Sequence, residues 1–377
     1  MNWEHHAREL AAALEASEDL KSAPLREAVI GTPRHIFLPH YFEAREGTPT
    51  LWVERTEADG DAWRKPIYSN TTLVTELDRE TAKQVEGGWN GYPTSSSTQP
   101  GLVVRMLEAL DIRPAHTVLD AGLGTGYQAA LIANCLRDSH QLATTDIGST
   151  ELAHERLDAL GYSPTVVRAD ATKREWQRQF DRMVFSFGLP RVTHTIRQAV
   201  APGGRIIANV FGPISSGLAV LDAQKEGMLE GRFLTRGGSF MPARHDHRDV
   251  PEADLSSAAE GWTDVPVADF DDYHFLFLLA AHLPGVNLQY GVEEGQFMRR
   301  LVLPDGRWGE AVYVAQEGAR PQFREQGEEV WENVERVWSW WTSKGRPRCD
   351  EFGLTVDSDG THRLWYQTPK GESWVLS

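Results

Sequence analysis

The chain has 377 residues, of which 41% are hydrophobic and 24% charged, a composition typical of soluble globular proteins of one or two domains. Acidic residues outnumber basic ones by 54 to 38, and the net charge of −16 argues against a nucleic acid partner. No apolar run is long enough to span a bilayer, and no secretory signal precedes the first helical pattern. We therefore expect a cytoplasmic protein without membrane contacts, in which Cys135 and Cys349 are reduced thiols.

Residues 1–92 are predicted to be a helical segment followed by an insertion. Apolar residues recur at helical spacing over 3–30, and a proline at each end of PRHIFLP stops this pattern. We expect His35 in that motif to pack against the N-terminal helix. From 42 to 92 the sequence is polar with little periodicity, which we interpret as irregular chain with a short helix at 75–86.

Residues 93–245 are predicted to form a doubly wound α/β core. Short Val/Ile-rich segments alternate with amphipathic ones, and this alternation indicates a parallel sheet with helices on both faces. The expected strands are 116–122, 141–146, 164–170, 180–188 and 205–212, and the expected helices are 101–112, 126–137, 150–160 and 191–200.

Residues 246–377 are predicted to be an α+β extension, preceded by an acidic, polar linker over 245–261. Its expected elements are a helix at 270–282, a hairpin turning at Asp305-Gly306, a Trp-rich helix at 328–341 and a hairpin turning at Asp359-Gly360. Trp331, Trp338 and Trp341 share one helical face and are expected in the core of the extension. Trp340 lies off that face and is expected to be an exposed substrate contact.

A glycine cluster, VLDAGLGTGY, joins the first strand of the core to the next helix. Glycines at Gly122, Gly124 and Gly126 permit positive φ angles and allow the main chain to lie against a ligand, although packing alone is an alternative explanation. The spacing differs from the G-x-G-x-x-G of dinucleotide sites, and Asp120 precedes the loop. A carboxylate there repels a pyrophosphate and suits an ammonium or sulfonium group, which favours S-adenosylmethionine over a dinucleotide.

Two further carboxylates end the following strands of the predicted sheet. Asp146 lies 20 residues beyond Gly126, where a carboxylate can accept both ribose hydroxyls. Asp170, followed by the small Ala171, ends the third strand and is placed to face an adenine edge. The pairs His5-His6 and His245-x-His247 lack other ligands at metal-binding spacing, so we interpret them as surface histidines and predict no metal site.

The motif VLDAGLGTGYQAA, with STQPGLVVRMLEAL before it and PRHIFLP near the start, resembles the protein L-isoaspartyl O-methyltransferase family. The resemblance continues through FDRMVFSFGLP, APGGRII, VFGPISSG and GGSFMPAR, and it covers about residues 20–245. It implies a Rossmann-like class I methyltransferase core that uses S-adenosylmethionine. The extension, with FGLTV and GTHRLWYQTP, is similar to that of longer relatives encoded with ribosomally made, modified peptides of the graspetide type, and it is expected to be absent from the repair enzymes.

This second resemblance implies that the enzyme methylates an aspartate side chain of such a modified peptide, after which the ester closes to an aspartimide. The alternative is a general isoaspartyl repair methyltransferase with an accessory domain. A third hypothesis is a non-catalytic module that retains the cofactor and binds a peptide or a partner enzyme.

Five hydroxyl residues, TSSST at 94–98, precede the first helix of the core. In the repair enzymes the corresponding segment ends in Ile-Ser-x-Pro, and matching on Pro100 places Thr98 at the active-site serine, with Ser97 beside it at the cofactor. Pro100 suits the first helical position, so Gln99 is expected to be the N-cap and the Thr98 hydroxyl to be free. The alternative is that Thr98 or Ser97 caps the helix.

Ser95 and Ser96 are expected to be loop residues or substrate contacts rather than catalytic groups. No His or Glu lies beside the glycine loop as a general base. A carboxylate substrate does not need one, because its reference pKa of about 3.9 makes it an anion at neutral pH. Its methylation depends mainly on alignment with the methyl donor, which Thr98 would assist.

Overall fold

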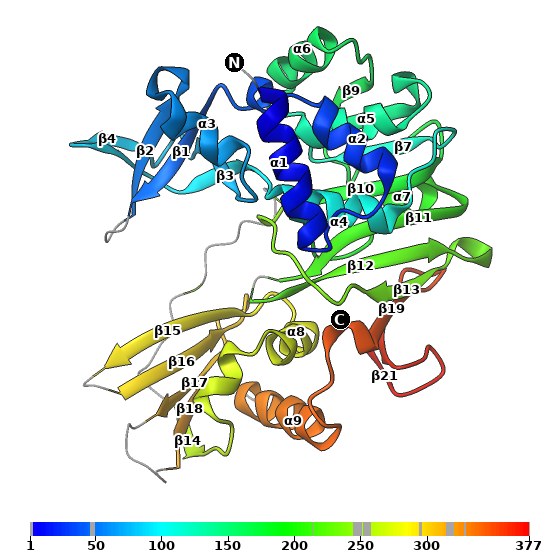
Figure 1. Cartoon of the computed structure of the whole chain (residues 1–377). Helices are drawn as coiled ribbons and strands as arrows, with labels where there is room; N and C mark the ends of the chain where they lie inside the picture. The colour runs from blue at the N-terminus through cyan, green and yellow to red at the C-terminus, as the bar shows by residue number, and fades with distance from the viewer. Residues whose placement is uncertain are drawn as a thin grey trace. The chain divides into compact units, whose positions relative to one another are not determined.

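The computed structural model describes residues 3–45, 50–212, 214–243, 251, 258–293, 296–313, 320–327 and 329–376. The chain divides into two compact units, one of residues 1–186 and 193–207 and the other of residues 187–192 and 208–377 (Figure 1). This division differs from the predicted boundaries at 92 and 245, because the N-terminal segment folds within the first unit and the second unit begins well before 245. The predicted linker over 245–261 lies largely outside the described residues.

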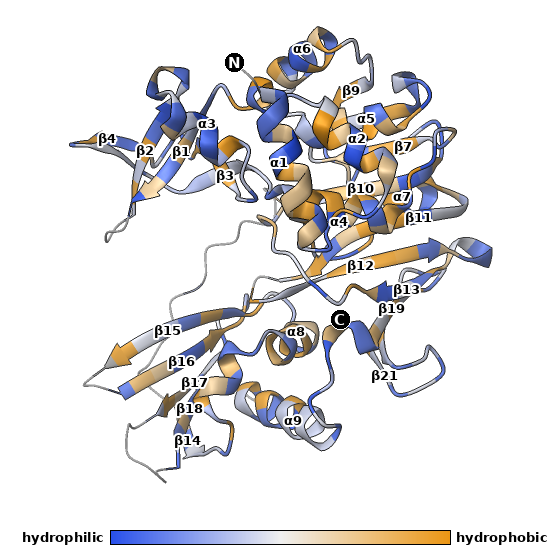
Figure 2. Ribbon diagram, in the orientation of Figure 1, coloured by the Kyte–Doolittle hydropathy of each residue, from blue (hydrophilic) through white to orange (hydrophobic). Residues whose placement is uncertain are grey.

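A parallel sheet forms the centre of the first unit. In it β10, β7, β8 and β9 are neighbours in that order, and each neighbouring pair is parallel. All four residues of β7 are buried, as coverage on both faces requires, and Figure 2 shows hydrophobic residues along β10 and β11. The predicted doubly wound α/β core is confirmed. The strands are β7 (Val118–Ala121), β8 (Leu142–Asp146), β9 (Thr165–Arg168), β10 (Phe180–Leu189) and β11 (Val200–Phe211).

The helices of the first unit lie close to their expected positions. Helix α4 (Pro100–Leu110) precedes the first core strand, and α5 (Tyr127–Cys135), α6 (Glu151–Ala159) and α7 (His194–Ala199) lie between core strands in the sequence. The N-terminal helical pattern is two helices, α1 (Trp3–Ala16) and α2 (Ala23–Gly31), and α1 buries Ala7, Leu10, Ala11 and Leu14 on one face. His35, in the 3-10 turn η1 (Arg34–Phe37), has its ring 6.2 Å from that of Trp3 in α1, so its expected packing is confirmed.

A six-stranded antiparallel sheet occupies residues 40–97, where the sequence indicated irregular chain. Its strand order is β4-β5-β2-β1-β3-β6. The expected helix at 75–86 is wrong, because β3 and β4 occupy that segment. These strands are short and half-exposed, so their pairing rather than a local hydrophobic alternation defines them. The elements are β1 (His40–Arg45), β2 (Leu51–Thr56), α3 (Asp61–Ile67), β3 (Leu73–Leu77), β4 (Lys83–Val85), β5 (Gly88–Asn90) and β6 (Pro93–Ser97).

Most of the hydroxyl run lies in β6, at the edge of this sheet. Ser97 pairs with Leu73 and Ser96 with Val74 of β3, and the Ser95 hydroxyl is 3.1 Å from that of Thr75. The expectation that Ser95 and Ser96 belong to a loop is therefore wrong. Cross-strand pairing with β3 supplies the order that the polar composition of this segment does not suggest.

The second unit contains two antiparallel sheets among its described residues. The first, β12-β13-β19-β20-β21, is the antiparallel part of a ten-stranded sheet, and the second is a five-stranded sheet with the order β14-β18-β17-β16-β15. Both predicted hairpin turns are confirmed, at Asp305-Gly306 and Asp359-Gly360, with φ of 89° at Gly306 and 92° at Gly360. The strands are β12 (Ser216–Ala223), β13 (Leu229–Phe233), β14 (Ala259–Trp262), β15 (Asn287–Glu293), β16 (Gln296–Val302), β17 (Trp308–Tyr313), β18 (Gln322–Gln326), β19 (Phe352–Val356), β20 (His362–Tyr366) and β21 (Ser373–Leu376).

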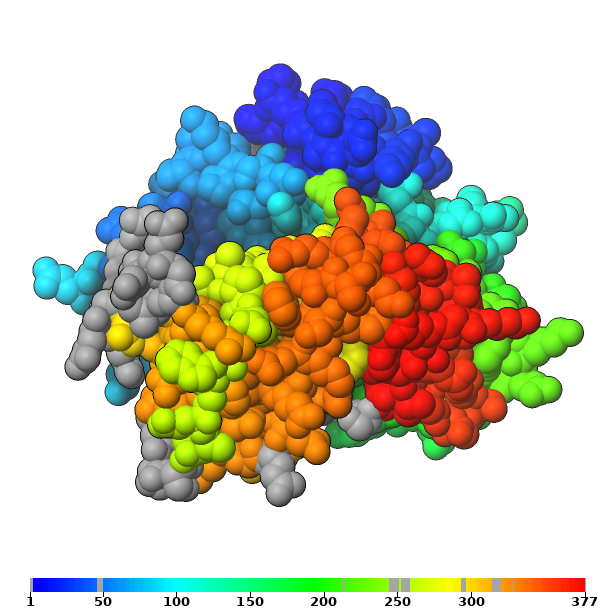
Figure 3. Space-filling view, turned by 90° about the horizontal axis from the view of Figure 1, so that it is seen from below, coloured from blue at the N-terminus to red at the C-terminus, as the bar shows by residue number. Residues whose placement is uncertain are grey.

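Helices α8 (Tyr273–His282) and α9 (Val330–Ser343) complete the second unit, and Figure 3 shows α9 beside the C-terminal strands. Trp331 and Trp341 are buried, as expected, and Trp331 stacks on Phe323 of β18 at a ring distance of 6.0 Å. Trp338 is half-buried and donates its indole N–H to Asp269. No helix in the described part of the chain is both long and apolar enough to cross a membrane.

Candidate functional site

The turn between β7 and α5 has the backbone conformation that its glycines suggest. The φ angles of Gly122, Gly124 and Gly126 are 98°, 51° and 93°, in the left-handed region that favours glycine. A Cβ at Gly126 would lie 3.3 Å from the Phe37 ring, so this glycine serves packing, whereas one at Gly124 would meet nothing within 4 Å. The main chain at Gly124 is therefore exposed and open to a ligand.

The two strand-end carboxylates lie at the same edge of the parallel sheet as this loop. Asp146 accepts hydrogen bonds from the N–H groups of Gly124 (3.0 Å) and Gly148 (2.8 Å). Asp170 accepts from the N–H (2.9 Å) and hydroxyl (2.6 Å) of Thr172, which hold its carboxylate in place beside the buried Ala171. The Ala169 N–H donates to the Asp146 carbonyl at 2.9 Å, so the ends of β8 and β9 are joined directly.

Asp120 lies beneath the loop and is fully buried. One carboxylate oxygen, Oδ1, accepts a hydrogen bond from Gln128 Nε2 at 2.7 Å, and the same nitrogen is 2.8 Å from the Ser186 hydroxyl. The other oxygen, Oδ2, has no hydrogen-bond partner among the described residues. Burial raises the pKa of Asp120 to about 7, with a smaller contribution from the charge of Asp146. A buried, unpaired carboxylate oxygen is costly unless a ligand satisfies it.

The Thr98 hydroxyl is free of the helix, as expected. Gln99 is the N-cap of α4 and Pro100 its first residue. The N–H of Gly101, which has no acceptor within the helix, donates to Asn70 Oδ1 at 2.7 Å, and Gln99 in turn donates its side-chain N–H to the Asn70 carbonyl. Asn70 therefore takes the role that the alternative assigned to Thr98 or Ser97. No hydrogen bond joins the half-buried Thr98 hydroxyl to another residue that the structure describes.

Arg34, in PRHIFLP, is a site residue that the sequence analysis missed. It is fully buried, and in the described part of the chain it has no carboxylate partner. Burial lowers its pKa to about 10, so it remains a cation at neutral pH. The available signal was an arginine between two prolines, in a motif that is apolar apart from Arg34 and His35. Its guanidinium donates to the carbonyls of Ile67 (2.6 Å), Ser69 (3.3 Å), Thr71 (3.5 Å) and Thr98 (3.3 Å) and to the hydroxyl of Ser97 (3.2 Å).

Arg34 thus places an uncompensated positive charge directly behind the Ser97-Thr98 turn. Its guanidinium also lies 5.4 Å from the ring centre of Tyr127, the first residue of α5 after the glycine loop. The hydroxyl turn, the glycine loop and a buried cation therefore meet in one region of the first unit. Because the Arg34 charge has no carboxylate partner among the described residues, the electrostatic environment beside Thr98 favours an anionic group such as a carboxylate over a neutral oxygen-containing group.

Trp340 lies in the second unit, and its surroundings do not match the expectation of an exposed contact. Its indole N–H donates to Glu372 at 2.6 Å, and its ring lies 4.8 Å from that of Trp374 and 5.3 Å from that of Tyr366. The residue is half-buried in this aromatic cluster. The Trp340 ring packs against the C-terminal hairpin, and this contact covers most of its surface. Local sequence spacing could not reveal a contact between such distant parts of the chain.

No group of metal-ligating side chains gathers in the described residues, and His245 and His247 lie outside them. Both cysteines are free and buried, and burial raises the pKa of each thiol to about 11. Neither thiol has the exposure or lowered pKa of a reactive nucleophile.

A Rossmann-like sheet with a glycine loop and strand-end carboxylates defines a class I methyltransferase fold. A solved protein-L-isoaspartate O-methyltransferase aligns with 96% of this chain and 100% of its own, with a TM-score of 0.52 and 16% identity, which supports the fold alone. The model of the Protein-L-isoaspartate(D-aspartate) O-methyltransferase (PCMT) family matches residues 70–244.

Relatives with curated functions agree with the family match. The protein-L-isoaspartate O-methyltransferase of Stenotrophomonas maltophilia (strain R551-3) is 32% identical over 172 residues, which are 45% of this chain and 72% of that protein. The chain belongs to the protein-L-isoaspartate O-methyltransferase family. It covers 58% of protein-L-isoaspartate O-methyltransferase 2 of Syntrophobacter fumaroxidans, at 32% identity and with 39% of this chain aligned, and 53% of the Aeropyrum pernix enzyme, at 30% identity and with 35% aligned. The chain thus spans a little over half the length of these two relatives.

Proposed function

We propose that this chain is an S-adenosylmethionine-dependent O-methyltransferase that methylates a side-chain carboxylate of a polypeptide. The observation that carries the proposal is the unpaired, buried oxygen of Asp120 beneath a glycine loop, in a chain of the isoaspartyl methyltransferase family. The names of the family and of its curated members supply the substrate class, an isoaspartyl or aspartyl carboxylate.

The residues of the site fit the cofactor. The open main chain at Gly124 and the two carboxylates at the strand ends suit an adenosine, with Asp146 on the ribose and Asp170 and Ala171 at the base. Asp120 Oδ2 lacks a donor, which an ammonium group or an ordered water bound to it would supply. When bound, S-adenosylmethionine would offer a methyl group on a positively charged sulfur, which a carboxylate oxygen can displace.

The chain's own residues bind and orient the substrate carboxylate. The free Thr98 hydroxyl donates one hydrogen bond to it, and the Arg34 charge behind the turn favours an anion without forming a direct ion pair. Ser97 is already engaged by Arg34, so its role is to fix the turn rather than to contact the cofactor freely. The carboxylate needs no general base, because it is already ionised at neutral pH.

An isoaspartyl residue of a damaged protein is the substrate that the relatives' names support. The narrower candidate is an aspartate of a modified ribosomal peptide, whose ester would lose methanol as the next backbone nitrogen attacks it. The observation that favours this candidate is that the family match ends at residue 244, which leaves most of the second unit outside it. We propose that the second unit contributes to polypeptide recognition in either case.

Matched peptides test the proposal. Two peptides of one sequence, with aspartyl or isoaspartyl at a single position, are incubated with enzyme and S-adenosylmethionine and followed by mass spectrometry. A gain of one methyl group on the isoaspartyl peptide alone supports repair. Methylation of neither peptide, while a modified ribosomal peptide gains a methyl group and then loses methanol, supports the narrower candidate. Absence of methylation on all three contradicts the proposal.

A further inference from the structure

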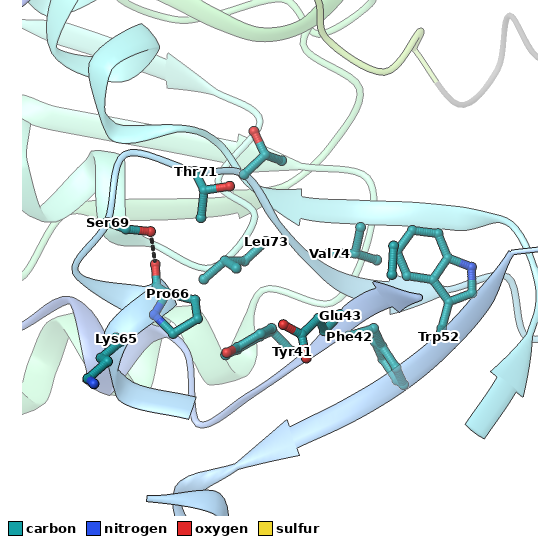
Figure 4. Close-up of a pocket in the computed structure, with 12 residues that line it drawn as sticks. Tyr41, Phe42, Glu43, Trp52, Lys65, Pro66, Ser69, Thr71, Leu73 and Val74 are labelled. Carbon is teal, nitrogen blue, oxygen red and sulfur yellow. Dashed lines mark hydrogen bonds between the residues drawn. The ribbon is translucent and has the colours of Figure 1, made fainter. Parts of the chain in front are cut away.

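A cavity of about 660 Å³ lies in the first unit between β1, the end of α3 and the segment that leads into β3 (Figure 4). Phe42 and Trp52 lie on one side of this space, and Pro66, Ser69 and Thr71 lie on the other. None of its lining residues belongs to the glycine loop or to the strand-end carboxylates. The volume falls in the range of about 300–1,000 Å³ that is typical of ligand sites.

The cavity lies where β1 and β3 share little ladder pairing. Strand β1 pairs with β2 at six register positions, from His40 to Arg45, but its described pairing with β3 is Phe42 with Val74. Beyond that point β3 shifts register against β6, between Val74 and Glu76 and again between Glu76 and Leu77. Apart from Phe42 and Val74, no ladder pair joins β1 to β3 among the described residues, so side chains rather than ladder hydrogen bonds line the space beside that pair.

The walls of the cavity are fixed by hydrogen bonds. The Trp52 indole N–H donates to the Gly91 carbonyl at 2.9 Å, and the Tyr41 hydroxyl donates to the Ala62 carbonyl at 2.9 Å. Glu43 is held by Arg55 at 2.6 Å. With these polar groups engaged elsewhere, the aromatic rings and the side chains of Leu73 and Val74 give a mostly apolar interior, to which Lys65, Thr71 and Thr72 add polar groups. Such an interior suits an aromatic or long aliphatic side chain.

The same arginine joins the cavity wall to the Thr98 turn. Arg34 binds the carbonyls of Ser69 and Thr71, which line the cavity, and one of its nitrogens lies within 3.5 Å of both the Thr71 and the Thr98 carbonyl oxygens. Because an extended chain advances about 3.3 Å per residue, the wall lies within about two residues of a carboxylate held at Thr98.

We propose that this cavity binds an apolar side chain, aromatic or long aliphatic, of the polypeptide substrate, close in sequence to the residue that is methylated. The inference rests on the proposed function and adds a specificity site to it. Most lining residues precede residue 70, where the family match begins, so the larger part of the site lies in chain that the family model does not cover. By binding a neighbouring side chain, the cavity determines which substrate carboxylates bind beside Thr98. The methyl transfer itself takes place near the glycine loop.

The test uses two substitutions that fill the cavity and one control. Ala44→Trp places an indole in the cavity from β1, and Thr72→Trp places one there from the segment before β3. Both positions are exposed, so the fold should tolerate the substitutions. Lys83→Trp adds the same group at an exposed position of β4, outside the lining. Isoaspartyl and aspartyl peptides carry tryptophan or alanine at successive positions on either side of the target residue. Turnover and equilibrium binding of labelled peptides are measured in parallel.

The wild-type enzyme and Lys83→Trp should show a KM about tenfold lower for the tryptophan peptide at one position, with equal kcat. Both filling variants should lose this preference while their KM for the alanine peptide and for S-adenosylmethionine stays unchanged. Turnover without any tryptophan preference, or a preference that survives both fillings, overturns the cavity inference and leaves the proposed function standing. Tryptophan-dependent binding that both fillings abolish, with no turnover on any peptide, supports the cavity and refutes the function. Absence of both binding and turnover refutes both.

Discussion

Replacing Asp120 with asparagine should remove a pH dependence from the stability of the cofactor-free protein. The pKa of Asp120 rises from 3.8 to about 7 in the folded state. Between these values the folded state holds a proton that the unfolded state has released, so the free energy of unfolding falls as pH rises through this window. Below this window Asp120 is protonated in both states. Above it Asp120 is ionised in both states, and the folded state bears the full cost of burying the charged carboxylate.

The size of the effect follows from the shift. A shift of about three pH units corresponds to up to about 4 kcal/mol at about 1.4 kcal/mol per unit. The asparagine keeps an acceptor for Gln128 and has no ionisation, so its own contribution does not vary with pH. Relative to Asp120→Asn, the wild-type protein should therefore lose up to about 4 kcal/mol between pH about 4 and pH about 8.

Urea unfolding of both proteins at several pH values, without cofactor, measures this difference. The same pair should differ in cofactor binding. If the ligand needs the ionised carboxylate, wild-type affinity rises about tenfold per pH unit below about 7 and then levels off, whereas the variant shows a flat profile. Parallel stability curves for the two proteins across this range would refute the argument that burial holds a proton on Asp120.

Three further substitutions test the rest of the site. Thr98→Ala should lower kcat by about ten- to a hundredfold with unchanged cofactor Kd, because a hydrogen bond to a charged group is lost. Thr98→Ser, which keeps the hydroxyl, should restore most of the kcat. Equal loss of kcat and cofactor affinity in Thr98→Ala would indicate a structural role. Asp146→Ala should weaken cofactor binding about a hundredfold in calorimetry, and an unchanged Kd would exclude its ribose role. Arg34→Met should lower the free energy of unfolding, measured by urea denaturation, by about 2–4 kcal/mol, and it should also reduce kcat in the fraction that remains folded. Unchanged stability would contradict the hydrogen bonds of Arg34 to the surrounding carbonyls.

The parts of the fold that local chemistry encodes could be predicted from the sequence. The alternation of apolar strands and amphipathic helices gave the parallel sheet, and the Asp-Gly pairs at 305–306 and 359–360 gave both hairpins. Pro100 fixed the start of α4 and left the Thr98 hydroxyl out of the cap. Each of these signals acts over a few residues, so no tertiary information was needed.

The parts that depend on distant contacts could not be predicted. The hydroxyl run becomes the edge strand β6 only because β3 pairs with it, and a run of serines carries no strand signal. The cap from Asn70 and the burial of Arg34 among main-chain carbonyls both need the chain to return from elsewhere in the sequence. The division of the chain near residue 207 also depends on distant contacts, because β13 and β19 pair although more than a hundred residues of sequence separate them.

That pairing also determines how the second unit should be tested. Deleting residues 250–377 would remove β19 and leave β13 paired on one side only, so loss of activity would report misfolding rather than recognition. Exposed side chains of β15 and β16, such as Tyr290, Val292 and Phe297, are better targets for substitution because they leave both sheets intact.

Carboxyl O-methylation is the central claim, and the stability of the transferred methyl group tests it most directly. The enzyme is supplied with S-adenosylmethionine labelled in the methyl group and with an isoaspartyl polypeptide, and the labelled product is then treated with mild base. A carboxyl methyl ester releases its label as methanol, whereas an N-methyl group or a methyl ether retains it. We expect the label to be incorporated and then released completely as methanol. Two results would contradict the account: label that survives base, and the absence of incorporation into any aspartyl, isoaspartyl or modified ribosomal peptide.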